Sequence, residues 1–300
     1  MRSIDFDISL AKGYVDFEAL YTGSNTDRPL VVVNATRANC VSAFVKKVFH
    51  CCWLMADFDG TLTMGSQWDD ARNLMGPERA EVDRVALKRW TESDRSFQSE
   101  CEFIFGTVDL LCESGLTQGQ LFAVARAQRP RPGALELLHS FELSVDGSEY
   151  PDHIVRSFIV SYGMDCYICE WASHNGVFAK VLALKLRWDK DSKLIGYYAD
   201  TVVVGTNKGN KAKEVHERFG VIPSLQLVLA DAPSDKDLFH DKSVNVLILP
   251  HTEVEEAISK FRRKGLPDVW NLVDAILVGD SLEPLYEMRR NHTAVAKLGQ

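Results

Sequence analysis

Short apolar runs alternate with amphipathic stretches along much of this sequence. Runs with the length of buried strands occupy residues 30–33, 51–56, 153–161, 225–230 and 244–249. Apolar residues recur at helical spacing from Val41 to Phe49, which predicts an amphipathic helix leading into the second of these strands. Residues 211–220 and 253–264 predict two further helices. Strands that alternate with helices predict an α/β fold built on a parallel sheet.

Two stretches depart from this alternation. Residues 66–141 show helical spacing with little β-branched alternation, and the run from Arg129 to Gly133 interrupts them before a helix restarts at Ala134. This segment is predicted to be a helical insert directly after the strand at 51–56. Residues 177–204 carry a polar turn at 189–193 between apolar runs and predict a hairpin. A helix between these stretches is expected to close at residues 174–176.

Polar side chains follow the predicted strands at the points where each one ends. Asp57 and Asp59 follow the strand at 51–56, and Gly60 and Thr61 form the turn by which the chain leaves it. Residues two apart on an extended chain point the same way, so both carboxylates can face one site. Two such carboxylates repel each other, so either the pKa of one of them rises or a cation binds, for which Mg²⁺ is the expected ion. An Asp-Gly turn with no catalytic role is the alternative interpretation of this stretch alone.

Further chemistry-bearing residues recur in order along the chain: Ser161, Lys211, Asp231 and Asp235. Phosphoryl transfer needs such a set, because it uses a nucleophile, an acid and base, positive charge on the phosphoryl oxygens, and a metal. A carboxylate nucleophile forms an aspartyl-phosphate, which divides one difficult displacement into two easier ones.

With these residues the chain resembles the haloacid dehalogenase superfamily of phosphatases, in the branch that has a helical cap and includes the phosphoserine phosphatases. Residues 57–61 match the first motif of that family, Asp-x-Asp-x-Thr. Ser161 matches the second motif and Lys211 the third, with Lys208 as a rival, and Asp231 with Asp235 matches the fourth. The resemblance implies a Rossmann-like three-layer α/β core with a parallel sheet and an inserted α-helical cap domain. Three divisions are expected: an N-terminal extension and first core strand with the first motif (residues 1–65), the helical cap (residues 66–149) and the remainder of the core (residues 150–300).

The resemblance also implies a role for each residue. Asp57 would be the nucleophile, and Asp59 would protonate the leaving oxygen and then activate water. Mg²⁺ would be held by Asp57, by Asp59 through its backbone carbonyl, and by Asp231, while Asp235 would support Asp231 or orient Lys211. The phosphoryl oxygens would be bound by residues of the first three motifs, namely Gly60, Thr61, Ser161 and Lys211.

Several positions depart from the family pattern. Tyr162 stands where the second motif usually has Gly, and Ala230 replaces the Gly that usually begins the fourth. Ser66 stands nine residues after Asp57, where the phosphoserine enzymes carry a substrate-reading Glu, which argues against phosphoserine as the substrate. Residues 278–281, Val-Gly-Asp-Ser, imitate the fourth motif but have no acid four residues further on.

Composition and charge limit the classes of partner that we expect for this protein. The 300 residues carry a formal net charge of −8 with no long basic run, so nucleic acid is not an expected partner. No apolar stretch approaches the roughly 18 residues of a membrane span, and the N-terminus lacks the apolar core of a signal peptide. Seven cysteines without an export signal predict reduced thiols and a cytoplasmic protein.

The predicted function is therefore a Mg²⁺-dependent phosphatase of a small phosphorylated metabolite. A nucleotidase or phosphotransferase of the same fold is the alternative among enzymes, and a non-catalytic phosphate-binding scaffold is the alternative from another class.

Overall fold

The computed structural model describes residues 6–22, 28–92, 96–142, 155–249 and 269–291. An eight-stranded sheet runs through the molecule in the order β1-β2-β10-β9-β8-β3-β4-β5. The strands from β10 to β5 are parallel to one another, while β2 pairs antiparallel with β10 and β1 pairs parallel with β2. Their bounds are β1 Asp7–Ala11, β2 Leu30–Asn34, β3 Trp53–Ala56, β4 Ser157–Met164, β5 Lys180–Leu184, β8 Gln226–Ala230, β9 Val244–Leu249 and β10 Ala275–Val278.

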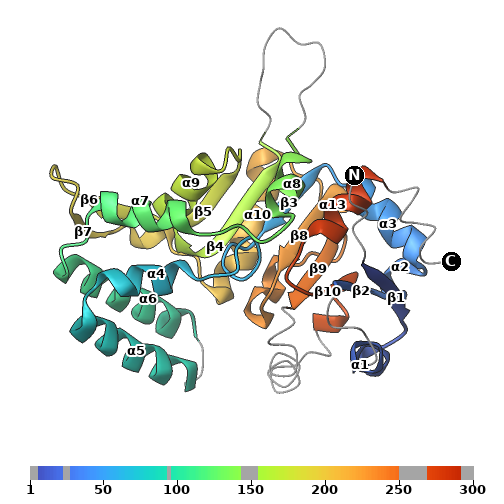
Figure 1. Cartoon of the computed structure of the whole chain (residues 1–300), viewed down its shortest axis with the longest axis horizontal. Coiled ribbons are helices and arrows are strands. Elements are labelled where there is room, and N and C mark those ends of the chain that lie inside the picture. The colour runs from blue at the N-terminus through green and yellow to red at the C-terminus, as the bar shows by residue number, and fades with distance from the viewer. Residues whose placement is uncertain (1–5, 23–27, 93–95, 143–154, 250–268, 292–300) are drawn as a thin grey trace, which may run out of the picture.

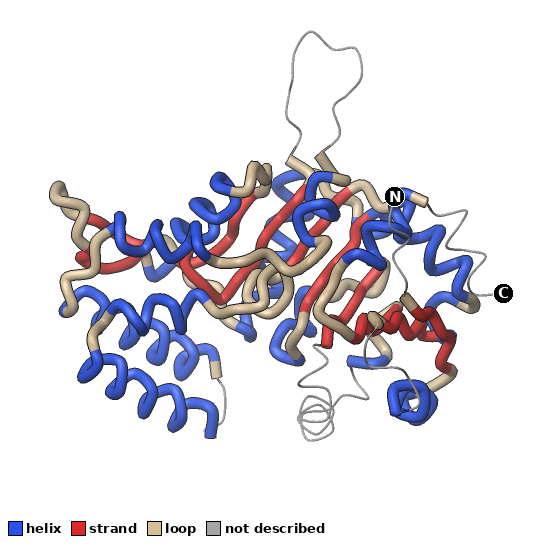
Figure 2. Tube along the Cα trace, viewed as in Figure 1, coloured by secondary structure: helices blue, strands red, loops and turns tan. Residues whose placement is uncertain are grey.

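Helices cover both faces of this sheet (Figures 1 and 2). Alternating strand residues divide between two cores: Val31 and Val33 pack in one, and Leu30 and Val32 in the other. The first core includes apolar residues of α3 (Val41–His50), α8 (Ala134–His139), α9 (Asp165–His174) and α13 (Glu283–Arg290). The second includes residues of α1 (Tyr14–Thr22) and α10 (Lys208–Phe219). The α/β fold predicted from the alternating runs, and the three-layer core implied by the resemblance, are therefore confirmed.

A helical segment lies between β3 and β4, as the change of spacing after residue 66 predicted. It contains α4 (Gln67–Leu74), α5 (Pro77–Glu92), α6 (Phe97–Glu113) and α7 (Gln118–Ala127). A buried polar cluster joins the first three of these helices, because Arg72 Nε lies 2.6 Å from Asp83 Oδ2 and Thr107 Oγ1 donates to Asp83 Oδ1 at 2.6 Å. The ends of the segment meet where Thr63 forms a β-bridge with Pro130. In Figure 1, α4, α5 and α6 lie together at the β6–β7 end of the molecule, away from α3 and α13.

Several local predictions need correction. The strand expected at 153–161 is β4, which runs three residues further and contains Ser161 in its interior. The hairpin expected over 177–204 is confined to β6 (Leu186–Trp188) and β7 (Leu194–Tyr197), while β5, within the same stretch, pairs with β4 at the edge of the main sheet. Strands β1 and β10 and the short helix α2 (Ala35–Ala38) were not anticipated. The helix expected at 253–264 lies outside the described residues.

Candidate active site

The carboxylates of Asp57 and Asp231 come together because β3 and β8 are paired, parallel neighbours. Ala56 pairs with Leu229, and the Asp57 N–H donates to the Leu229 carbonyl at 3.0 Å, so both strands end at the same edge of the sheet. Ligands of open α/β sheets bind beyond this edge. Asp235 reaches the same place from the 3₁₀ helix at Pro233–Leu238. One carboxylate oxygen from each of the three acids lies within 4.8 Å of the others.

Lys208 is the lysine that the fold brings to these acids. It is the first residue of α10, its side chain is only 2% exposed, and its Nζ lies 3.1 Å from Asp57 Oδ1 and contacts Asp235 Oδ1. Burial lowers the pKa of this ammonium, but the charges of Asp235 and Asp57 outweigh burial and raise it, so Lys208 carries its charge at neutral pH.

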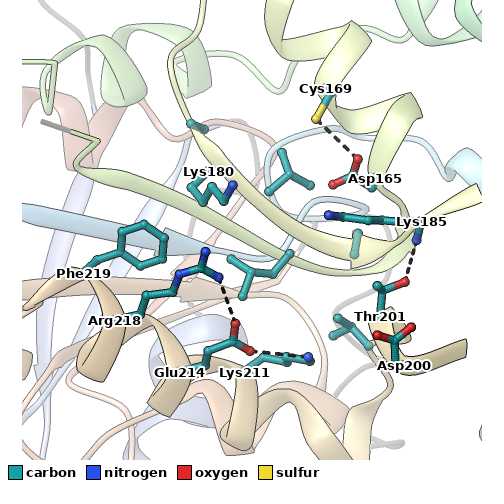
Figure 3. A pocket seen from close by; sticks show the side chains of 15 residues that line it. Asp165, Cys169, Lys180, Lys185, Asp200, Thr201, Lys211, Glu214, Arg218 and Phe219 are labelled. Atoms are coloured by element: carbon teal, nitrogen blue, oxygen red, sulfur yellow. Dashed lines mark hydrogen bonds and ion pairs between the residues drawn. The ribbon is translucent and has the colours of Figure 1, made fainter. Parts of the chain in front are cut away.

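Lys211, which the sequence favoured over Lys208, lies elsewhere. It sits three residues later on α10, about 4.5 Å further along the helix axis, where its Nζ lies 3.5 Å from Glu214. Lys211 lines a separate pocket of about 500 Å³ together with Lys180 and Lys185. Figure 3 shows these three side chains around that pocket. The structure therefore places Lys208, the rival, beside the acids in place of Lys211, because α10 begins at Lys208 and presents that residue to the strand ends.

Asp59 is held by Gln67, a residue that no sequence pattern singled out. The Gln67 backbone N–H donates to Asp59 Oδ1 at 3.1 Å and its side-chain amide donates to Oδ2 at 3.2 Å. The Gln67 amide oxygen in turn accepts from the Met164 N–H at 2.6 Å, so the start of α4 is tied to β4. Gly163 makes this possible, since a Cβ at that position would overlap the Gln67 side chain.

Burial controls the charge state of both acids of the first motif. It raises the pKa of Asp59 to about 7, against the hydrogen bonds from Gln67, which lower it. It also raises the pKa of Asp57 to about 6, and the neighbouring Lys208 charge opposes the rise. Burial and the charge of Asp57 raise the pKa of Asp231 as well. A carboxyl group with a pKa near the working pH is suited to both giving and taking a proton.

The turn that carries Gly60 and Thr61 packs directly on Asp231. Thr61 Oγ1 donates to Asp231 Oδ1 at 2.9 Å. Gly60 has a positive φ of 73°, and a Cβ there would overlap the Asp231 carboxylate, so a glycine is required for two reasons. These residues therefore support Asp231.

Arg131 is buried and binds the backbone of this turn. The sequence indicated this residue only as part of a helix break. Arg131 is 2% exposed, and its Nε donates to the Thr61 carbonyl at 3.0 Å, while one terminal nitrogen donates to the Gly60 carbonyl. Its other terminal nitrogen donates to the Gly279 carbonyl at 3.2 Å, just past the end of β10. Arg131 thus connects the first-motif turn to Gly279, which lies 148 residues after Arg131 in sequence, just past β10.

Ser161 lies on β4, the other neighbour of β3. Its side chain is buried, and its Oγ accepts the Gly163 N–H at 3.2 Å. It does not line the pocket at the acids in the described part of the chain, and neither does Asp280, the acid of the imitation motif. Asp280 instead lies 4.0 Å from Arg131.

A pocket of about 180 Å³ opens over the acids. The strand ends, α10 and the region after β8 contribute Asp57, Asp59, Lys208, Asp231, Ala232 and Asp235 to its lining. Three other lining residues were not expected there: Tyr162 from β4, Trp90 from α5 and Glu100 from α6. The helical segment therefore forms part of the wall of this pocket.

The carboxylates of Asp57, Asp231 and Asp235 fit a hard divalent cation. Their donors are all carboxylate oxygens, the ligand type that Mg²⁺ prefers. Asp235 Oδ2 is buried and accepts no hydrogen bond from the described residues, which leaves it available to a cation or to water.

None of the described helices has the length and apolar character needed to cross a bilayer.

No family model and no curated protein matches this sequence. Solved structures are nevertheless similar. Cytosolic 5′-nucleotidase IIIB bound to cytidine superposes with a TM-score of 0.60 at 14% identity, over 94% of this chain and 98% of that one. A probable phosphoserine phosphatase from Vibrio cholerae gives a TM-score of 0.57 at 14% identity, over 84% and 69%.

A HAD family hydrolase from Salmonella enterica subsp. enterica serovar Typhi gives a TM-score of 0.54 at 14% identity, over 67% of this chain and 63% of that one, so less than two thirds of its length is matched. The chain has the fold of the haloacid dehalogenase superfamily. The resemblance inferred from the motifs is thereby confirmed at the level of the fold.

Proposed function

We propose that this protein is a Mg²⁺-dependent phosphatase that hydrolyses a small phosphorylated metabolite through an aspartyl-phosphate on Asp57. The observation that carries the proposal is the meeting of the Asp57, Asp231 and Asp235 carboxylates with buried Lys208 at the carboxyl ends of β3 and β8. Within the haloacid dehalogenase fold, this is the set of groups that phosphoryl transfer requires.

In this proposal Asp57 attacks phosphorus while the bond from phosphorus to the substrate oxygen breaks. Asp59 donates a proton to that oxygen, and the alcohol leaves. Asp59 then takes a proton from the water that attacks the aspartyl-phosphate, which releases inorganic phosphate and restores the Asp57 carboxylate. The pKa of about 7 at Asp59 supports this double role.

The remaining residues bind and orient. Asp57, Asp231 and the Asp59 backbone carbonyl would hold Mg²⁺, which supplies positive charge against the phosphoryl oxygens when bound. Lys208 would neutralise the same oxygens in place of Lys211, and Asp235 holds Lys208 toward Asp57. Gly60, Thr61 and Ser161 remain proposed contacts of the phosphoryl group.

We also propose that α4–α7 act as a cap over the site. Trp90 and Glu100 support this role, because both belong to the helical segment and line the pocket over the acids. The predicted cap range, 66–149, also includes α8, which lies against α13. The pocket of about 180 Å³ lies below the roughly 300–1,000 Å³ of most ligand sites, which favours a small substrate.

Turnover of an aryl phosphate with and without Mg²⁺, for the wild type and for Asp57→Asn, tests the proposal. Hydrolysis that needs Mg²⁺ and is lost in Asp57→Asn supports it. A wild type with no turnover of any phosphomonoester would favour the non-catalytic phosphate-binding scaffold.

A nucleotidase is the second candidate, because the similarity to cytosolic 5′-nucleotidase IIIB extends over 94% of this chain. Adding a nucleoside 5′-monophosphate and an acceptor alcohol to the substrate panel separates a nucleotidase or a phosphotransferase from a general phosphatase.

The free state of all seven cysteines is in keeping with the cytoplasmic location that we propose.

A further inference from the structure

We infer that Gln67 is the residue that positions Asp59 for proton transfer, and that it does so through hydrogen bonds to both oxygens of the carboxylate. The inference rests on the proposed phosphatase function and deepens it. Gln67 is the first residue of α4 and is completely buried, with 0% of its surface exposed. Among the described residues it is the one donor of hydrogen bonds to the Asp59 carboxylate, with its backbone N–H at 3.1 Å from Oδ1 and its side-chain amide at 3.2 Å from Oδ2.

An aspartate does not fix the plane of its own carboxylate. The torsion that sets this plane has a broad, two-fold energy profile, so outside partners decide which way the oxygens face. Two donors on one residue, one for each oxygen, hold the Asp59 carboxylate in a single orientation. A proton donor works when its oxygen lies within about 2.6–3.2 Å of the atom that receives the proton. A carboxylate that is free to turn therefore loses rate even where its Cα stays in place.

The Gln67 side chain is itself fixed. Its amide oxygen accepts the Met164 N–H at 2.6 Å, and a backbone N–H can bond only to that oxygen, so the NH₂ group faces Asp59. Strand β4 departs from regular pairing with β5 between Val160 and Met164, and within this stretch Gly163 has no Cβ to overlap the Gln67 amide. Such irregularities are common beside active sites, where they redirect side chains.

Gln67 also joins Asp59 to two other parts of the molecule. The first N–H groups of a helix have no partner within the helix, and at α4 the Ser66 side chain does not cap them. Asp59 takes this place, since it accepts the Gln67 N–H. Met164, the other partner of Gln67, lies three residues after Ser161 of the second motif. The orientation of the acid therefore depends on how the helical segment is seated on β4.

A purely structural role for Gln67 predicts a different outcome from a positioning role. Replacing a glutamine that only stabilises the fold would lower the rates with all substrates by the same factor. A residue that positions Asp59 matters only where Asp59 has to give a proton. An alkoxide needs that proton in order to leave, whereas acetate leaves as a stable anion without it. The dependence of the rate on the leaving group therefore distinguishes the two roles.

Isopropyl phosphate and acetyl phosphate form a matched pair of substrates for this test. Their organic parts have nearly the same size and shape, but only isopropyl phosphate needs a proton on the leaving oxygen. With Mg²⁺ present, we expect Gln67→Met to lower kcat/KM by about 10²-fold for isopropyl phosphate and by about twofold at most for acetyl phosphate. Gln118→Met is the matched control and should leave both values unchanged. Gln118 is likewise the first residue of a helix in the same segment, α7, and it does not line the pocket over the acids.

The ratio of the two kcat/KM values is measured on one sample, so a smaller folded fraction lowers both values equally and leaves the ratio unchanged. If Gln67→Met does not fold, Gln67→Glu takes its place. An ionised carboxylate accepts the Met164 N–H but has no N–H to donate to Asp59, so the same selective loss is expected.

Equal losses with both substrates, or an unchanged rate with isopropyl phosphate, overturn the inference and keep the phosphatase. A wild type that hydrolyses acetyl phosphate but not isopropyl phosphate lacks the positioned proton donor and overturns the inference as well. A wild type that hydrolyses neither substrate refutes the phosphatase and, with it, the inference.

Discussion

Replacing Arg131 with methionine should destabilise the protein and should also loosen the turn at Gly60 and Thr61. The change keeps an unbranched apolar side chain but removes the guanidinium group that donates to the carbonyls of Gly60, Thr61 and Gly279. Each buried carbonyl left without a donor costs about 1–3 kcal/mol, so three cost about 3–9 kcal/mol. Removing a buried charge returns several kcal/mol of desolvation. We therefore expect a net loss of about 3 kcal/mol in the free energy of unfolding.

Urea unfolding measures this loss. With an m-value of about 3 kcal/mol/M, the unfolding midpoint should fall by about 1 M. Turnover of an aryl phosphate, measured where the variant remains folded, should fall as well, because the released turn no longer presents Thr61 to Asp231. Arg129→Met is the control, since Arg129 is exposed and lies two residues away. If both variants unfold at the same urea concentration, the hydrogen bonds of Arg131 do not hold the turn.

Three further predictions concern the site. Lys208→Met should lower kcat by about 10²–10³-fold, as loss of a preorganised charge contact does, whereas Lys211→Met should change it little; the opposite order would restore Lys211 as the phosphate ligand. Gly163→Ala should displace Gln67 and lower kcat, and it should lower the free energy of unfolding by about 1–3 kcal/mol because the buried Met164 N–H loses its acceptor; normal turnover would show that Gln67 does not position the acid. In metal-free protein the pKa of Asp57 is raised, so the native state binds more protons than the unfolded state between about pH 4 and pH 6. The free energy of unfolding should therefore fall by about 3 kcal/mol from this group as the pH rises through that window. Thermal unfolding across pH should show a shallower fall in Asp57→Asn, and equal slopes would contradict the pKa assignment.

The sequence alone determined the acids of the site, because their signal is local. Asp57 and Asp231 each follow an apolar run with the length of a buried strand, and parallel strands bring their carboxyl ends to one edge of a sheet. The helical segment was equally readable, since its spacing differs from that of the strands on both sides. These features depend on nearest neighbours along the chain, so no knowledge of distant contacts was needed.

The tertiary structure decided everything that depends on the direction of a side chain or on a distant partner. Lys208 and Lys211 differ by less than one helical turn, and only the packing of α10 against the strand ends shows which one reaches Asp57. Arg131 looked like part of a helix break until the fold placed it beneath the first-motif turn and beside β10. Glu100 lies in an ordinary helical pattern, and it lines the pocket because the helical segment folds back over the acids. Local spacing predicts which elements form, but contacts between elements far apart in the chain decide which side chains share a pocket.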